Sequence, residues 1–299
     1  MDIYQAAPVK HATILGVLCG AGAALFWAFG FVAARHGVVL GMSPLVLALH
    51  RFVWPGLALF PLLAANGLRD LGGLGWRGWG RAIAITLFGG LPLALWSYIG
   101  YVYVPLGHGA IIQPSCAAVG GLILARLVIK EALPPRRIAG ALAIVLGLVV
   151  IGAEALRTMG AHGVLGDLLF VAAGSSFAVF GMLLRLWRIP PIYAAAVTSV
   201  LSLAGLPILF FTYANFLAAG LYENLLQAVV QGIFAGPAAI YLFTRAVILL
   251  GAGRAALYPS LVPPFTLAIG FLTLGIVPSI PQLVGLAIVL VGFRLTQTG

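Results

Sequence analysis

One segment of this chain occurs twice. Residues 107–148 recur at 252–293 with a constant offset of 145, so that Pro114 matches Pro259. The other matched pairs are Pro92 and Pro237, Ser115 and Ser260, Gly140 and Gly285, Gly147 and Gly292, and, at an offset of 150, Ala28 and Ala178 and Arg35 and Arg185. The chain is therefore an internal duplication, and each half should fold into the same structural unit.

The composition excludes a water-soluble fold. The chain is 63% hydrophobic and 7% charged, whereas a soluble domain carries about 25% charged residues. Lipid is therefore the solvent that we expect for its surface. The net charge of +10 is scattered through short loops, which argues against a nucleic-acid partner. Cys19 and Cys116 both lie in apolar segments, where they are interpreted as packing residues and not as a disulfide or metal pair.

Apolar segments long enough to cross a bilayer divide the chain evenly. A spanning helix needs about 20 mainly apolar residues. The predicted spans are 12–34, 44–65, 81–103, 107–129, 137–155, 164–186, 191–212, 225–250, 253–276 and 281–297. The sequence thus predicts an all-α polytopic membrane protein with ten transmembrane helices. The first repeat covers residues 1–155 and the second covers 156–299, both within one integral domain. Because five is odd, the second repeat must be inverted relative to the first.

The distribution of basic residues predicts the orientation. With the N-terminus in the cytoplasm, only Arg35, Arg51 and Arg157 of the 16 Lys and Arg residues fall on the outer side. Basic residues concentrate in cytoplasmic loops of membrane proteins. We therefore expect both termini to be cytoplasmic and the protein to be a multi-pass protein of the cell inner membrane.

Four prolines recur at equivalent places inside predicted spans: Pro92 and Pro237 form one pair, and Pro114 and Pro259 the other. Proline removes a backbone hydrogen bond and clashes with the preceding turn. Broken backbone at membrane depth is tolerated only where protein or a water-filled cavity covers it. These prolines are predicted to be hinges or cavity-lining kinks, with an ordinary packing kink as the alternative.

Aromatic and polar side chains at comparable depth are the candidate substrate-binding residues. The aromatic candidates are Trp27, Trp96, Tyr98, Phe177 and Tyr241, and the polar candidates are Gln113, Ser175, Ser176 and Tyr258. Bulk for packing or lipid contact is the alternative for the aromatics. Hydrogen bonding to the helix backbone is the alternative for the serines.

Ionisable residues within the spans are few. His50 is the candidate titrating group of the binding site, because an unperturbed histidine changes charge near neutral pH. Arg51 either extends toward the outer interface or pairs with Glu154 or Asp167. No predicted span contains a carboxylate at mid-depth, so a carboxylate proton relay is not expected.

Motifs for catalysis are missing. The sequence contains no Gly-x-Ser-x-Gly, no His-Glu-x-x-His, no acidic metal cluster and no Walker A loop. We therefore predict no enzyme activity, no catalytic or metal-ligating residues and no cofactor.

Three stretches resemble the EamA-type drug/metabolite transporter superfamily. They are Ala24-Leu-Phe-Trp-Ala-Phe-Gly-Phe-Val, Leu49-His-Arg-Phe and Gly253-Arg-Ala-Ala-Leu-Tyr-Pro-Ser-Leu-Val-Pro-Pro-Phe. The closing Pro281-Gln-Leu-Val-Gly-Leu-Ala-Ile-Val-Leu-Val-Gly is also typical. The aromatic residues make the chain most similar to the aromatic amino-acid exporters. Gly107-His-Gly-Ala departs from the common pattern, in which a polar or basic residue more often precedes the alanine.

The resemblance implies an exporter of small neutral or zwitterionic solutes, aromatic amino acids above all, working by alternating access around a central cavity. Its partners would be the small-molecule substrate and the lipid bilayer. The oligomeric state stays open, and a monomer is compatible with the sequence. Two other classes remain as alternatives: a carrier of nucleotide sugars or sugar phosphates, and a membrane-embedded enzyme.

Overall fold

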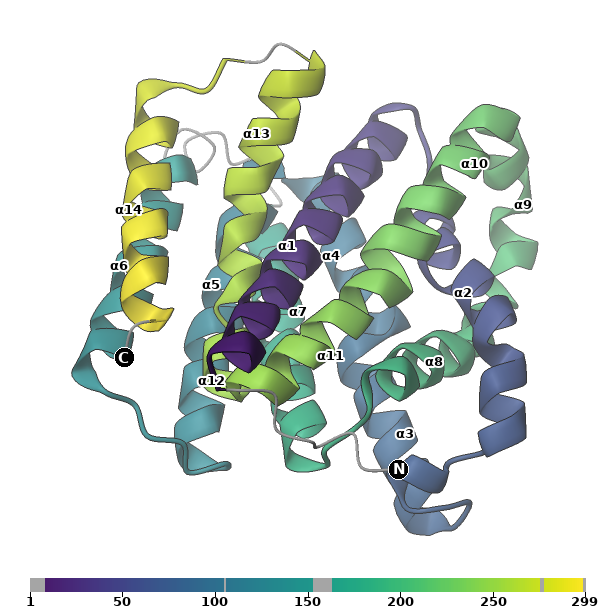
Figure 1. Ribbon diagram of the computed structural model, residues 1–299. Coiled ribbons are helices and arrows are strands. Elements are labelled where there is room, and N and C mark those ends of the chain that lie inside the picture. The colour runs from purple at the N-terminus through teal and green to yellow at the C-terminus, as the bar shows by residue number, and fades with distance from the viewer. Residues whose placement is uncertain (1–8, 105, 153–162, 275–276, 298–299) are drawn as a thin grey trace.

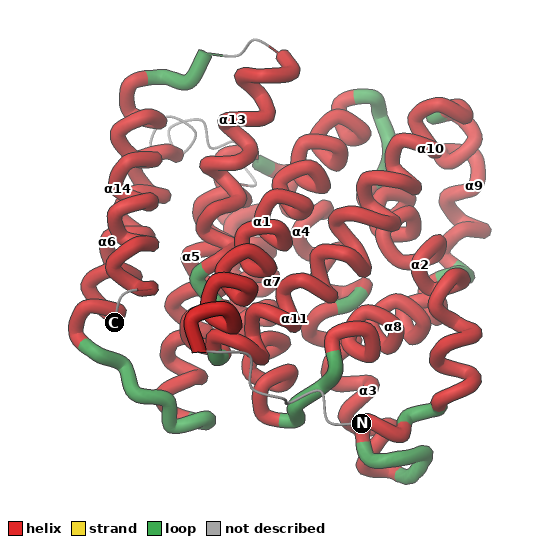
Figure 2. The backbone as a smooth tube through the Cα atoms, viewed as in Figure 1, coloured by secondary structure: helices red, strands yellow, loops and turns green. Residues whose placement is uncertain are grey.

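The computed structural model describes residues 9–104, 106–152, 163–274 and 277–297, and within these ranges it contains helices and no strand. Figure 2 shows this helical course along the described chain. The α-helices are α1 (Val9–Val39), α2 (Pro44–Asn66), α3 (Trp76–Gly89), α4 (Leu91–Tyr103), α5 (Leu106–Leu127), α6 (Pro135–Gly152), α7 (Gly163–Leu186), α8 (Pro191–Leu201), α9 (Ile208–Ala218), α10 (Gly220–Val229), α11 (Ala239–Leu250), α12 (Ala252–Ala255), α13 (Val262–Leu274) and α14 (Ile280–Gln297). The 3₁₀ segments are η1 (Arg69–Leu71), η3 (Ser202–Gly205) and η5 (Tyr258–Leu261), and a π-helix, η4 (Val230–Ala238), joins α10 to α11.

Five helical segments among the described residues are long and apolar enough to cross a membrane. They are Ala12–Val39, Pro44–Asn66, Trp76–Tyr103, Gly163–Leu186 and Gly220–Leu250. Shorter apolar helices cover Ile112–Leu127, Pro191–Gly205 and Ile280–Thr296. The protein is thus helical and rich in membrane-spanning segments, while the count of ten, the inversion of the repeats and the position of the termini stay predictions.

Local sequence explains where α2 begins and ends. The Ser43 hydroxyl accepts a hydrogen bond from the Val46 N–H at 3.3 Å, and Pro44 occupies the first turn. A side-chain acceptor and an early proline are the usual features of a helix start. Gly67 ends the helix with a φ of 56°, a backbone conformation that favours glycine.

Helices from the two halves of the sequence interleave. The most extensive helix–helix packings pair α6 with α14, α5 with α7, α1 with α11, α4 with α7 and α2 with α8. Each pair joins a helix before residue 153 to one after residue 162, so neither half forms a separate core.

The pair of α6 and α14 lies at one edge of the molecule, on the left in Figure 1. Glycines hold these helices in close contact. A Cβ added to Gly140 would lie 2.6 Å from the Gly292 carbonyl oxygen, and one added to Gly147 would lie 2.7 Å from the Gly285 carbonyl oxygen. Conversely, a Cβ added to Gly292 would lie 2.7 Å from the Gly140 carbonyl oxygen, and one added to Gly285 would lie 2.6 Å from the Gly147 carbonyl oxygen. The glycines that recur in the two repeats therefore meet each other across one interface, as small residues do in membrane helix pairs.

Candidate functional site

A central cavity lies between helices of both halves. Its volume is about 790 Å³, including the part that opens to solvent. The lining residues are Trp27, Gly30, Phe31, Arg51, Gly89, Leu93, Ala94, Ser97, Tyr98, Gln113, Pro114, Ala117, Phe177, Phe180, Ile240, Pro259 and Val262. A largely apolar wall with a few polar groups is typical of small-molecule sites.

Aromatic rings form one wall of the cavity. Trp27 and Phe177 pack edge to face with ring centroids 5.1 Å apart, and behind them Phe243 lies 4.8 Å from Phe177 and 5.4 Å from Trp27. Such contacts fix the ring orientations. Phe31 lies four residues after Trp27 and Phe180 three after Phe177, so each shares a helix face with its partner. Helical spacing from Trp27 and Phe177 would have found these two missed residues.

Polar side chains occupy a second part of the lining. The Ser97 hydroxyl lies 3.1 Å from the Leu93 carbonyl oxygen and 3.0 Å from Gln113 Oε1. The buried Tyr98 hydroxyl donates to Gln231 Oε1 at 2.9 Å. Arg51 is half-buried, and its Nη1 lies 3.5 Å from the Tyr98 hydroxyl and 3.4 Å from Gln231 Oε1.

Arg51 therefore faces the cavity instead of extending to the interface. Glu154, one of its expected partners, lies outside the described residues, and Asp167 is not among its contacts. Sequence reasoning considered Arg51 but did not place it in the site. It also missed Ser97 and Gln231.

Helix breaks surround the cavity. Gly90 separates α3 from α4 with φ −103° and ψ −144°, two residues before Pro92. In the second half, Gly236 has non-helical φ and ψ values of −81° and −110°, directly before Pro237. The first proline pair thus follows an interruption in each half.

The second proline pair contributes to the lining itself. Pro114 lies within the continuous helix α5, whereas Pro259 lies in the 3₁₀ segment η5. The two halves therefore differ locally at these equivalent positions, although both prolines face the same cavity.

Several predicted binding residues lie away from the cavity. Trp96 is two positions from Tyr98 on the same helix, so it points to a different side, and Tyr241 is 39% exposed next to the lining residue Ile240. Ser175 is exposed on the outer face of α7. These placements correct the expectation that all the aromatics and serines at this depth share one site.

Two further predicted residues are committed to packing. The Ser176 hydroxyl donates to the Phe88 carbonyl oxygen at 3.0 Å, near the break between α3 and α4. The ring of Tyr258 is fully buried and packs edge to face with Phe293 at 4.9 Å. Neither is part of the lining, because each is held by a neighbouring helix.

His50 also lies outside the lining and is fully engaged. The Trp54 Nε1–H donates to His50 Nδ1 at 2.9 Å. The Asn224 amide nitrogen donates to the carbonyl oxygens of Phe216 and Gly220, so Asn224 Oδ1 is left to accept from His50 Nε2–H at 2.9 Å. These partners favour the neutral imidazole of His50. A proton added to Nδ1 would point at the Trp54 indole N–H, and the two donors would repel each other. The geometry does not favour His50 as a titrating group of the cavity.

Sequence reasoning missed the buried carboxylate of Glu223, because the eighth span begins before the predicted start at residue 225. The helical segment Gly220–Leu250 includes Glu223, which is 4% exposed. Its Oε1 accepts from Gln227 Nε2 at 2.7 Å, and its Oε2 lies 3.2 Å from His36 Nε2. Glu223 is therefore a structural partner near the end of a span and not part of the described cavity lining.

Comparison with known families decides the class of protein. The model of the EamA-like transporter family matches residues 14–153 and again residues 164–298. This chain belongs to the EamA-like transporter family. The family is one of membrane transporters of the drug/metabolite superfamily, and the two matched segments correspond to the two halves of the sequence.

Individual relatives of this EamA-like protein add the fold but no substrate. An uncharacterized transporter of Archaeoglobus fulgidus is 24% identical over 156 residues, which are 52% of this chain and 53% of the relative. The alignment therefore spans about half the length of that curated relative. A crystal structure of another protein, with 18% sequence identity, superposes with a TM-score of 0.66 over 96% of both chains. This likeness shows a shared fold.

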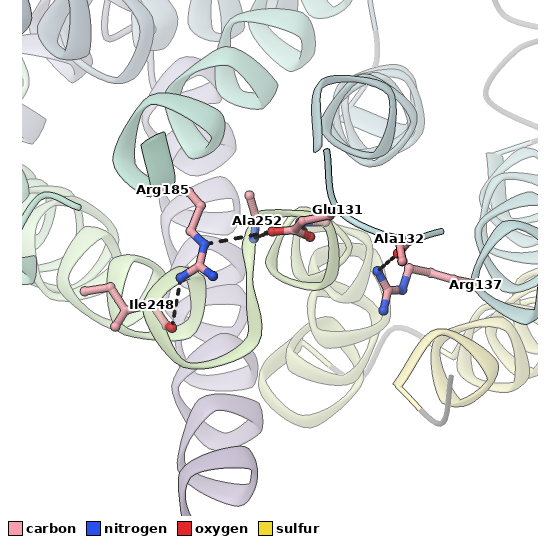
Figure 3. A network of polar contacts seen from close by, with 7 residues as sticks. Glu131, Ala132, Arg137, Arg185, Ile248 and Ala252 are labelled. Atoms are coloured by element: carbon pink, nitrogen blue, oxygen red, sulfur yellow. Dashed lines mark hydrogen bonds and ion pairs between the residues drawn. The ribbon is translucent and has the colours of Figure 1, made fainter. Parts of the chain in front are cut away.

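The EamA-like chain also carries a polar network outside the cavity, shown in Figure 3. Glu131, in the loop between α5 and α6, accepts hydrogen bonds from the N–H groups of Ala252 and Gly253 at 3.1 and 3.2 Å. Arg185, near the end of α7, lies 3.9 Å from the same carboxylate and donates to the Ile248 carbonyl oxygen at 3.4 Å. The network joins the two halves at the start of α12.

Proposed function

We propose that this EamA-like protein is an inner-membrane exporter of small neutral or zwitterionic solutes, preferably aromatic amino acids. The aromatic wall of the cavity supports the proposal, because Trp27, Phe31, Phe177 and Phe180 offer ring faces and edges to a solute. An aromatic contact contributes on the order of 1 kcal/mol beyond its burial.

The proposed mechanism is alternating access. Both halves supply lining residues, and interruptions at Gly90 and Gly236 lie two residues and one residue, respectively, before the equivalent prolines Pro92 and Pro237. In transporters built from repeats, one bundle rocks or gates against the other around a central site. We expect these two breaks to be the hinges.

Counterflow in proteoliposomes tests the substrate class. Vesicles loaded with unlabelled phenylalanine or alanine are given the same solute in labelled form outside. Trp27→Leu and Phe177→Leu should reduce phenylalanine exchange roughly fivefold more than alanine exchange, the equivalent of about 1 kcal/mol. Trp96→Leu and Tyr241→Leu are the matched controls, because both remove an aromatic ring away from the lining. Equal losses for both solutes in the lining variants would contradict the proposal.

One observation favours a second candidate, a carrier of anionic solutes such as sugar phosphates. Arg51 is the sole formal charge among the described lining residues. A phosphate ester would bind such a guanidinium strongly. Adding glucose 6-phosphate at the same concentration as labelled phenylalanine distinguishes the two candidates. A sugar-phosphate carrier would show competition, whereas we expect none.

A further inference from the structure

Arg51 has unused hydrogen-bonding capacity at the cavity. A guanidinium carries five N–H donors. Only Nη1 has partners in the described residues, the Tyr98 hydroxyl at 3.5 Å and Gln231 Oε1 at 3.4 Å. Both contacts are long, and both partners are neutral. Among the described residues, the Nε and Nη2 groups of Arg51 therefore have no partner.

The surrounding residues hold the guanidinium in place. The Gln231 amide nitrogen donates to the Gly30 carbonyl oxygen at 2.7 Å, so its oxygen must face Tyr98 and Arg51. Gly236 permits this arrangement, since a Cβ there would lie 3.1 Å from the Arg51 carbonyl oxygen. The π-helix η4 thus packs directly on the backbone of α2. This packing places Gln231 where its oxygen contacts the Arg51 guanidinium.

The charge lacks a counter-charge within the described part of the chain. No carboxylate lies within ion-pair distance of Arg51, and none lines the cavity. A charged side chain within a membrane-spanning segment normally pairs with another charge or faces a water-filled cavity. A carboxylate is the anionic group whose planar shape matches a guanidinium in a bidentate pair.

We propose that Arg51 is the anchor for a carboxylate of the transported solute, and that the substrates are aromatic carboxylates. The carboxylate lies against Nε and Nη2 of Arg51, while the ring lies against Trp27 and Phe177. An ammonium group on the solute is not required, because the described lining has no acidic residue to receive it. This inference rests on the proposed function and names the substrate class of the same cavity.

Three probes with one carbon skeleton test the proposal on the wild-type protein. They are 3-phenylpropanoate, the neutral 3-phenylpropanamide and the cation of 3-phenylpropylamine, each added as a competitor of labelled phenylalanine counterflow. The carboxylate should compete about as well as unlabelled phenylalanine. The amide and the amine should be weaker by at least about tenfold, the equivalent of one charge-assisted hydrogen bond.

Variants assign the preference to Arg51. Arg51→Gln should reduce the advantage of 3-phenylpropanoate over 3-phenylpropanamide by at least about tenfold, and Arg51→Lys should retain part of it, since lysine keeps the charge without the fork. Arg35→Gln is the control, because it removes one exposed positive charge from α1 and leaves the lining intact. Its probe ranking should be that of the wild type.

The outcomes separate this inference from the proposed function. If labelled phenylalanine shows no counterflow, the proposed function is refuted. If phenylalanine exchanges but none of the three probes competes, a ring and a carboxylate do not suffice for binding, and the carboxylate anchor is refuted. If all three compete equally in the wild type, the aromatic site stands and the carboxylate anchor is refuted. If the preference for the carboxylate persists in Arg51→Gln, another group binds it, and Arg51 serves only to join α2, α4 and η4. Should Arg51→Gln fail to fold, the wild-type ranking and Arg51→Lys still decide.

Discussion

The backbone N–H of Ala252 donates a hydrogen bond to Glu131 Oε1 over 3.1 Å, although the two residues belong to opposite halves of the duplicated sequence. The same carboxylate accepts from the Gly253 N–H at 3.2 Å. Glu131 thereby caps α12 and neutralises the positive end of that helix. Arg185 at 3.9 Å balances its charge, so three segments meet at one side chain.

Removing this cap should destabilise the protein. Glu131→Ala leaves two backbone donors without their acceptor and removes the ion pair with Arg185, and we expect a loss of about 1–2 kcal/mol in the free energy of unfolding. Thermal unfolding of the purified protein in detergent measures it. Asp70→Asn is the matched control, because the Arg69–Asp70 pair is exposed and its ions are 3.8 Å apart. Exposed pairs contribute little, so this variant should melt with the wild type. Equal melting temperatures for Glu131→Ala and Asp70→Asn would contradict the capping role.

The glycine contact between α6 and α14 predicts a strong effect of a single methyl group. Gly147→Ala would place its Cβ 2.7 Å from the Gly285 carbonyl oxygen and should cost about 1–3 kcal/mol by overpacking. Gly80→Ala is the control on the exposed side of α3, where an added Cβ meets nothing within 4 Å. That change should be neutral or stabilise the helix by about 0.5–1 kcal/mol. Unfolding in detergent compares the two, and a neutral Gly147→Ala would show that the helices separate without cost.

The hydrogen bond between His50 and Asn224 should appear as an energetic coupling. His50→Leu leaves Asn224 Oδ1 and the Trp54 N–H without their partner, and it should cost about 1–3 kcal/mol. In a double-mutant cycle with Asn224→Leu, the combined loss should be smaller than the sum of the single losses by at least about 0.5 kcal/mol. Additive losses would mean that the two residues do not interact.

Cysteine labelling tests the predicted orientation. In a background without Cys19 and Cys116, Leu74→Cys and Tyr222→Cys each introduce one thiol at a position that is 70% and 79% exposed, respectively. The basic-residue distribution predicts that position 74 is cytoplasmic and position 222 external. In intact cells, an impermeant maleimide should therefore label Tyr222→Cys and not Leu74→Cys. The reverse pattern would overturn the topology.

The candidate site could be predicted from sequence only in part. Of the predicted residues, Trp27, Tyr98, Gln113 and Phe177 line the cavity, together with Pro114 and Pro259, whereas Trp96, Tyr241, Ser175 and Tyr258 do not. Depth along a helix can be counted from its ends, and the count placed these residues at similar levels. The direction around the helix axis was the missing quantity. If Tyr98 were known to point into the cavity, Trp96 would be excluded from the lining, because residues two positions apart lie on different sides of a helix.

The sequence by itself determined the membrane class, the helical content, the duplication and the family, because apolar length, internal matches and local motifs are all linear features of the chain. Only the tertiary structure decided which side chains meet. A membrane helix is apolar toward lipid and apolar toward its neighbours, so hydropathy does not mark the inner face as it does in soluble proteins. The inward direction of Arg51 and the burial of His50 follow from how η4 and α10 pack on α2, through Gln231 and Asn224. Those contacts join residues more than 170 positions apart, a separation over which no local pattern carries information.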